Sequence, residues 1–185
     1  MWWSRLARPA LHAWSEAEPL RLVAQTVAKD DPEPNALASY GLLLRQEGAT
    51  APIDDDLWLR FVAGRPVSAL TTQFLTWCGD RLAAAGIATL VLIWDNASWH
   101  VSAAVRAWPR EHNQRVQRDG GVRIIPCWLP KQSPWLNPIE PKWMHAKRRI
   151  VEPARLLTAR ELEERGCAAF GCPLCDHLAI PHEAA

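Results

Sequence analysis

The first part of the chain alternates short apolar runs with polar turns. Residues 20–27 (LRLVAQTV) have the composition of a strand, and residues 29–34 (KDDPEP) carry the Asp and Pro residues typical of a turn. The apolar run at 36–45 (ALASYGLLLR) predicts a returning strand, so we expect these two strands to form a hairpin. Residues 46–56 are polar, and we expect a loop there.

The middle of the chain changes from helical spacing to a continuous apolar run. Apolar residues spaced three and four apart predict helices over 70–85, with Gly86 as the residue that ends the helix, and over 101–108. Residues 90–94 (LVLIW) are all apolar, which predicts a strand buried on both faces. The polar stretch 110–121 predicts that the second helix ends in a loop.

The last part of the chain predicts one more strand and two helices. Residues 122–129 read as a strand in which Pro126 requires an edge position or a bulge. A loop rich in Ser-Pro and Asn-Pro leads to a helix over 142–151, and residues 158–161 (TARE) form a capping box that begins a helix ending at about residue 170. This order of elements predicts an α/β fold, a mixed sheet with helices packed on it.

Charge changes this picture, because the formal net charge of +1 is unevenly distributed. Residues 16–56 hold nine acids and three bases, a net of −6, whereas residues 96–155 hold eleven bases and four acids, a net of +7. Such a basic block favours a surface that meets phosphates, although a lopsided solvated surface explains it too. The chain has no apolar run of the ~20 residues that cross a bilayer and no signal peptide, so we expect a cytoplasmic protein with reduced thiols.

Two acidic residues occupy positions that suit a catalytic or metal-binding role. Asp95 directly follows the apolar run, where open α/β sheets place functional groups, although an Asx-turn that closes the strand explains it equally well. Glu140 lies between Pro138 and Pro141, whose fixed φ angles hold its backbone in place as a metal ligand requires. The alternative is a capping box with Asn137, which Pro141 weakens because it disfavours helical geometry at the preceding residue.

The segments 94–100 (WDNASWH) and 129–143 (LPKQSPWLNPIEPKW) together resemble the DDE-type transposases of bacterial insertion sequences related to the eukaryotic mariner elements. Weaker similarity extends over most of the chain. The resemblance implies an RNase H-like catalytic core that cuts and rejoins DNA with two divalent metal ions, Mg²⁺ or Mn²⁺. In this pattern Asp95 matches the second catalytic acid and Glu140 the third, and both are expected to bind metal. Their spacing of 45 positions is long for the family, and we place the excess in 110–121.

The same resemblance implies that one acid is missing. The family's first catalytic Asp ends the first strand of its sheet, just upstream of the segment matched by Trp2 and Trp3, and a DNA-binding region precedes it. We therefore expect a partial, N-terminally truncated RNase H-like domain, with a core over 1–155, a C-terminal helix and tail over 156–185, and no first strand. Asp30 is a weak substitute, because it belongs to the expected turn.

Other residues carry weaker predictions. Four bases could bind the DNA backbone, with a solvated helix face as an equal alternative: Lys142, Lys147, Arg148 and Arg149. His100 is expected near the site in a supporting or packing role. The Cys172–Cys175 CxxC pair, with Cys167 and His177, suggests structural zinc only weakly, because a second pair at the usual spacing is missing.

These observations rank three functions. The first is the catalytic core of a DDE transposase, inactive alone because one acid is absent, with transposon ends and target DNA as partners. The second is a non-catalytic remnant that binds DNA or a related transposase, and a homodimer is compatible with either. The third is a zinc-stabilised interaction module.

Overall fold

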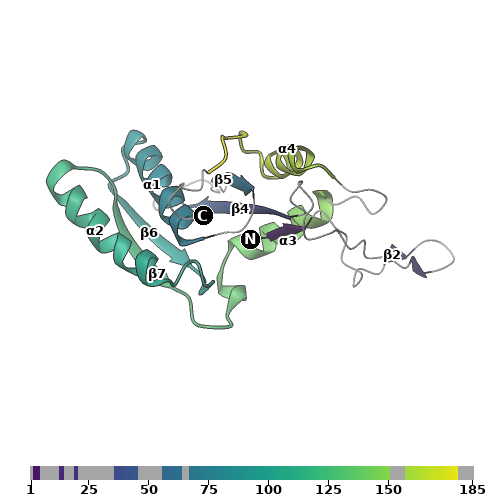
Figure 1. Cartoon of the computed structure of the whole chain (residues 1–185), viewed down its shortest axis with the longest axis horizontal. Coiled ribbons are helices and arrows are strands. Elements are labelled where there is room, and N and C mark those ends of the chain that lie inside the picture. Colours follow the sequence, from purple (N-terminus) through teal and green to yellow (C-terminus); the bar gives the residue numbers. More distant parts are fainter. Residues whose placement is uncertain are drawn as a thin grey trace. The chain divides into compact units, whose positions relative to one another are not determined.

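The computed structural model describes residues 2–4, 13–14, 19–20, 36–45, 56–63, 67–150 and 157–178 (Figure 1). The chain divides into two compact units. The first contains residues 1–65 and 142–177, and the second contains residues 66–141 and 178–185. Helices and strands occur in both, so the expectation of an α/β fold is confirmed.

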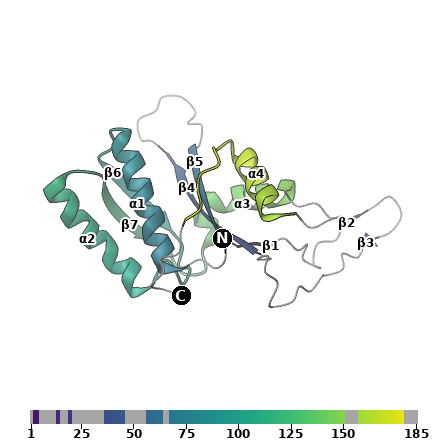
Figure 2. The same cartoon turned by 45° about the horizontal axis from the view of Figure 1, so that its top comes forward.

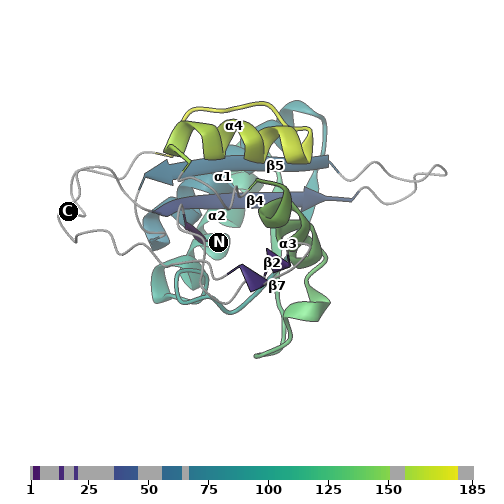
Figure 3. The same ribbon diagram turned by 90° about the vertical axis from the view of Figure 1, so that its right-hand side faces the viewer.

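The first unit is built on an antiparallel sheet. Strand β5 (Asp56–Ala63) pairs along its whole length with β4 (Ala36–Leu44), and β1 (Trp2–Ser4) pairs with the other edge of β4. Figure 3 shows β4 and β5 side by side with helix α4 (Ala159–Phe170) running along them. The core of this unit lies on that face, where Leu59 and Phe61 of β5 are only 2% and 1% exposed.

Most of the predicted hairpin between 20–27 and 36–45 lies outside the described residues, so its pairing stays a prediction. The described partners of β4 are β1 and β5, and β5 covers a segment in which the sequence analysis expected no strand. Of the expected first strand, only Leu20 is described, in β3 (Pro19–Leu20), which pairs with β2 (Ala13–Trp14). Residues 21–35 and 46–55, with the expected turn, Asp30 and most of the expected loop, lie outside the described residues.

Two helices complete the first unit. Helix α3 (Ile139–Ile150), which belongs to this unit from Lys142 onward, buries the predicted stripe of Trp143, Ala146 and Ile150. The predicted capping box of α4 is confirmed, since the Thr158 hydroxyl and the Glu161 carboxylate each bind the other's backbone N–H. Phe170, the last residue of α4, packs edge-on against Trp143 with ring centroids 5.0 Å apart.

The segment after α4 is held against the unit by charged and polar contacts. Gly171 has the left-handed φ of 66° that lets the chain turn back at the helix end. The Arg60 guanidinium then donates to the backbone oxygens of Asp176, at 2.9 and 2.6 Å, and of His177, at 3.2 Å. His177 Nε2 also lies 2.7 Å from the Glu163 carboxylate, so this buried acid has a partner.

The second unit has two parallel strands joined by a helix (Figure 2). Its elements are α1 (Ser68–Ala84), β6 (Thr89–Trp94), α2 (Ala103–Asp119), β7 (Arg123–Trp128) and the short 3-10 helix η1 (Pro134–Leu136). The predicted helix over 70–85 and the strands over 90–94 and 122–129 are confirmed within two residues. Gly86 ends the first helix with a φ of 76°, as expected.

The loop expected over 110–121 is wrong, because α2 continues through it to Asp119. This stretch is rich in Arg, Glu and Gln, which favour helices, and two of its side chains attach the helix to β7. The Asn113 amide donates to Ile124 O at 2.8 Å and accepts from Ile124 N at 2.9 Å, and His112 Nε2 lies 2.8 Å from Val122 O. The long spacing between Asp95 and Glu140 therefore contains a long helix.

The apolar run in β6 does not have two buried faces. Leu90, Leu92 and Trp94 are buried, whereas Val91 and Ile93 are 56% and 52% exposed. A run of five apolar residues hides this alternation, because the sequence does not distinguish the two faces. Pro126 lies in β7, opposite Leu92 of β6. Among the described strands β7 pairs only with β6, so within this part of the chain β7 is an edge strand, as Pro126 requires.

Candidate functional site

The carboxyl ends of β6 and β7 lie together. Trp94 and Trp128 are paired at the end of the parallel ladder, and Leu129 N donates to Trp94 O at 2.9 Å just beyond it. Two residues beyond Trp94, the Asn96 amide donates to the backbone oxygen of the same Leu129 at 2.5 Å. The segment that carries Asp95 and the segment that leads to α3 therefore leave the strands at the same end of this unit.

Asp95 is held by two donors that bind the same carboxylate oxygen. His100 Nδ1 lies 2.7 Å from Asp95 Oδ1, and Ala97 N donates to this oxygen at 3.0 Å. The His100 hydrogen bond is the main cause that lowers the pKa of Asp95 below its usual value, burial opposes it, and the Ala97 N–H adds to the lowering. Asp95 is therefore ionised at neutral pH, in the state that a metal ligand requires.

His100 is itself fixed in place, as a supporting residue must be. Its ring stacks on Trp94 with centroids 5.3 Å apart and meets the edge of Trp99 at 5.9 Å. Its backbone N–H donates to Ala97 O at 2.8 Å, and Trp99 O accepts from the Thr71 hydroxyl of α1 at 3.3 Å. The supporting role expected from the sequence thus has a direct contact, a hydrogen bond to Asp95.

Glu140 lies in the first turn of α3, with its N–H donating to Asn137 O at 3.0 Å. The expectation that Pro141 keeps Glu140 out of helical geometry is wrong. A proline is tolerated in the first helical turn, where its missing N–H has no intrahelical acceptor. Glu140 is half-buried and belongs to the same unit as Asp95.

The chemistry of these two acids suits a hard divalent cation. Mg²⁺ binds carboxylate oxygens and keeps its other positions for water and phosphate. At Asp95, both described hydrogen bonds use Oδ1, and no donor among the described residues binds Oδ2. Across the described ranges, no three His, Cys, Asp or Glu side chains form a group that could hold a metal ion. A complete set of metal ligands is thus not formed by the described residues.

Among the described residues, the side chains of the cysteine-rich segment do not form a group of three that could hold a zinc ion. In the described part, the Cys167 and Cys175 thiols contact Pro173 O at 3.7 and 3.9 Å, and His177 pairs with Glu163. The hydrogen bond to the Cys172 thiol and burial raise the pKa of Cys167.

The four predicted DNA-binding bases do not share one face of α3. Lys142 and Arg149 are seven residues apart, about two turns, and so lie on one side of the helix. Lys147 and Arg148 point elsewhere by the same geometry. Binding of DNA by these residues stays a prediction. A single DNA strand along one side of α3 would meet Lys142 and Arg149 but not Lys147 and Arg148.

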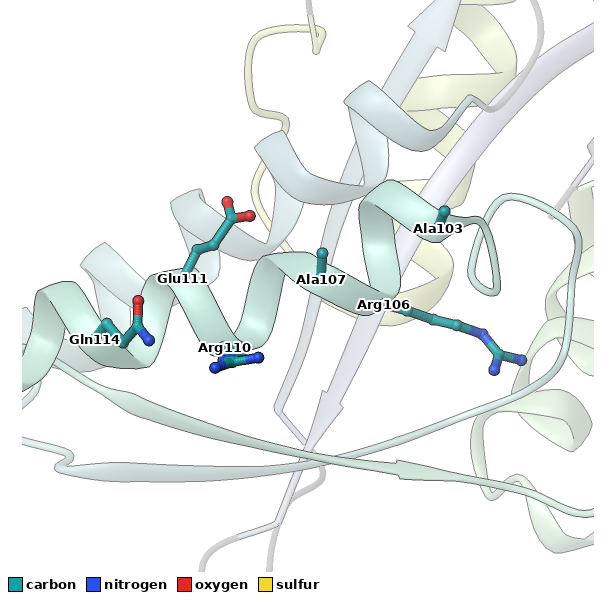
Figure 4. Close-up of a pocket in the computed structure, with 6 residues that line it drawn as sticks. All are labelled: Ala103, Arg106, Ala107, Arg110, Glu111 and Gln114. Atoms are coloured by element: carbon teal, nitrogen blue, oxygen red, sulfur yellow. The ribbon is translucent and has the colours of Figure 1, made fainter.

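A shallow hollow of about 660 Å³ lies along α2 and is drawn in Figure 4. Figure 4 shows that every lining residue comes from this one helix: Ala103, Arg106, Ala107, Arg110, Glu111 and Gln114. No second described element lines the hollow, so we assign it no function.

The second unit thus belongs to the class of α/β units that place acidic side chains beyond the carboxyl ends of parallel strands. A family model described as DDE superfamily endonuclease matches residues 61–163, more than half of the chain, and the chain belongs to this family. The match includes both Asp95 and Glu140, and membership indicates a nuclease- or transposase-like function on nucleic acid. No curated protein and no solved structure matched the chain. None of the helices that the structure describes has the length and apolar character needed to span a membrane.

Proposed function

We propose that this chain is the core of a DDE-type transposase, of the bacterial insertion-sequence kind related to mariner elements, with an RNase H-like fold. Its substrates are transposon ends and target DNA in the cytoplasm, and the reactions of the intact site are phosphodiester hydrolysis and transesterification. The observation that carries this proposal is Asp95 at the end of a parallel strand, fixed by His100 and Ala97 and kept ionised.

Asp95 and Glu140 would hold Mg²⁺ or Mn²⁺ in this site. When bound, a pair of such ions activates the attacking oxygen and stabilises the leaving oxygen of an in-line displacement. The protein's own contribution is to fix the ligands. His100 holds Asp95 through Oδ1, and Asn96 joins the Asp95 segment to the backbone that leads to Glu140.

We further propose that the chain alone does not cleave DNA, because the resemblance to the DDE pattern assigns two catalytic acids to this chain, Asp95 and Glu140, whereas the pattern has three. The alternative function is a non-catalytic protein that binds DNA or a related transposase.

A plasmid-nicking assay with Mg²⁺ or Mn²⁺, combined with a DNA-binding assay, tests these proposals. We expect DNA binding without nicking in the wild-type chain. Nicking that is lost in Asp95→Ala but kept in Asp119→Ala, an exposed acid at the end of α2 in the same unit, would overturn the proposed inactivity and confirm the site. The absence of both nicking and DNA binding would contradict the transposase proposal.

A further inference from the structure

The first unit contains a hollow of about 200 Å³ between α3, the end of α4 and the start of β5. Its lining residues are Leu57, Lys142, His145, Ala146, Arg149, Ala169 and Phe170. The volume equals roughly that of six or seven liquid water molecules, so one planar ring fits and a folded peptide does not.

One side of the hollow is apolar and rigid. Leu57 and Ala146 are each 3% exposed, so their positions are fixed by the core of the unit. Phe170 is half-exposed, and its ring is held in an edge-on contact with Trp143 at 5.0 Å and 85°. An aromatic ring that is partly exposed and fixed from behind is a surface on which a planar ring can stack.

The other side of the hollow is basic. Lys142, His145 and Arg149 follow one another at intervals of three and four residues, so they project from one side of α3. Lys142 and Arg149 are about 10 Å apart along the helix axis, at 1.5 Å per residue, so a single phosphate or two successive phosphates can meet them. Lys147 and Arg148 of the same helix do not line the hollow.

We propose that this hollow binds one unpaired nucleotide of a DNA strand, with its base against Phe170 and its phosphate against Lys142 and Arg149. The proposal rests on the proposed function, which supplies DNA as the partner. A base inside a duplex enters only after it is unstacked and flipped out, at a cost of a few kcal/mol, so a nucleotide in a single-stranded end is the favoured ligand. A free anion would use the basic side alone and would gain nothing from the apolar side.

The test compares the affinity of the full chain for two labelled DNAs, a blunt duplex and the same duplex with a short single-stranded overhang, by fluorescence anisotropy. The wild type is expected to prefer the overhang by roughly tenfold, the effect of stacking one base on an aromatic ring. Lys142→Ala with Arg149→Ala removes this preference. The matched control, Lys147→Ala with Arg148→Ala, removes the same charge from the same helix and keeps the preference.

Two further arms separate the base from the phosphate. Phe170→Leu retains an apolar side chain against Trp143, so the unit folds, and it is expected to lower overhang affinity while leaving blunt-duplex affinity unchanged. An abasic overhang is expected to bind like the blunt duplex, and equal binding of abasic and normal overhangs would overturn the assignment of a base site. Blunt-duplex binding without any overhang preference overturns the nucleotide site alone, whereas loss of all DNA binding overturns the proposed function as well.

Discussion

Replacing Asn96 with alanine tests whether the joined strand ends position the metal site. The substitution removes the amide that donates to Leu129 O at 2.5 Å. An intramolecular hydrogen bond contributes about 0.5–1.5 kcal/mol net, and a backbone oxygen left unsatisfied costs about 1–3 kcal/mol when buried. Because Asn96 and Leu129 are both partly exposed, water can replace the amide, and we expect a loss of about 1 kcal/mol in the free energy of unfolding.

The functional effect is expected to be larger than this small loss of stability. Groups that orient metal ligands typically change metal affinity by about 10–100-fold when they are removed. Without the Asn96 amide, the Leu129 segment that leads to Glu140 loses its side-chain link to the Asp95 segment. We expect the affinity for Mn²⁺, measured by electron paramagnetic resonance of the free ion, to fall by about tenfold.

Asn113→Ala is the matched control, because the Asn113 side-chain amide, like that of Asn96, forms hydrogen bonds with the backbone of β7 or its extension in the same unit. It makes two hydrogen bonds to Ile124, which pairs with Leu90 near the amino end of the ladder, away from Asp95. We expect it to cost about 2 kcal/mol in urea denaturation, more than Asn96→Ala, without changing Mn²⁺ affinity. Equal losses of affinity in the two variants would refute the reasoning, since general destabilisation would then explain both. Unchanged affinity in Asn96→Ala would refute it too.

Two further predictions follow from the pKa directions. The folded-state pKa of Asp95 is lowered, so its charge stabilises the fold above its ordinary value of 3.8 and loses this effect as the pH falls through the folded value. The difference in unfolding free energy between wild type and Asp95→Asn is therefore expected to be present at pH 7 and to disappear in acid, and a pH-independent difference contradicts this. The raised pKa of the buried Cys167 predicts slower alkylation by iodoacetamide than at the exposed Cys127, measured by peptide mass spectrometry; equal rates in the folded protein contradict it.

The sequence predicts a helix end well where a capping residue marks that end. The capping box at Thr158 and the left-handed Gly86 are recognised from residue type alone, because each satisfies the free backbone groups of its helix end locally. By contrast, the described partners of β4 are β1, from the start of the chain, and β5, the next strand, and no local pattern in the sequence indicates either pairing. The helix over 110–119 was missed for a similar reason, since its polar residues attach to β7 through a pairing that the sequence does not display.

In the candidate site too, some residues are found from local sequence patterns and others depend on strand pairing. Asp95 is found from sequence because a carboxylate directly after a buried strand is a local pattern. The role of Asn96 depends on the register that places Trp94 opposite Trp128, which follows only from the paired strands. His100 is predictable only in part. Its spacing from Asp95 is visible in the sequence, whereas its hydrogen bond to Asp95 depends on the turn that Ala97 closes.

The structure also shows that the two explanations of Asp95 do not exclude each other. An Asx-turn needs one acceptor oxygen, and the described hydrogen bonds from Ala97 and His100 both use Oδ1. A monodentate metal ligand needs the other oxygen, so the same side chain can close the strand and bind an ion. Asp95→Asn separates the two roles, because its amide oxygen still accepts from Ala97 while the charge that attracts the cation is lost. A variant that folds with this turn intact but no longer binds Mn²⁺ is therefore the outcome that the geometry requires.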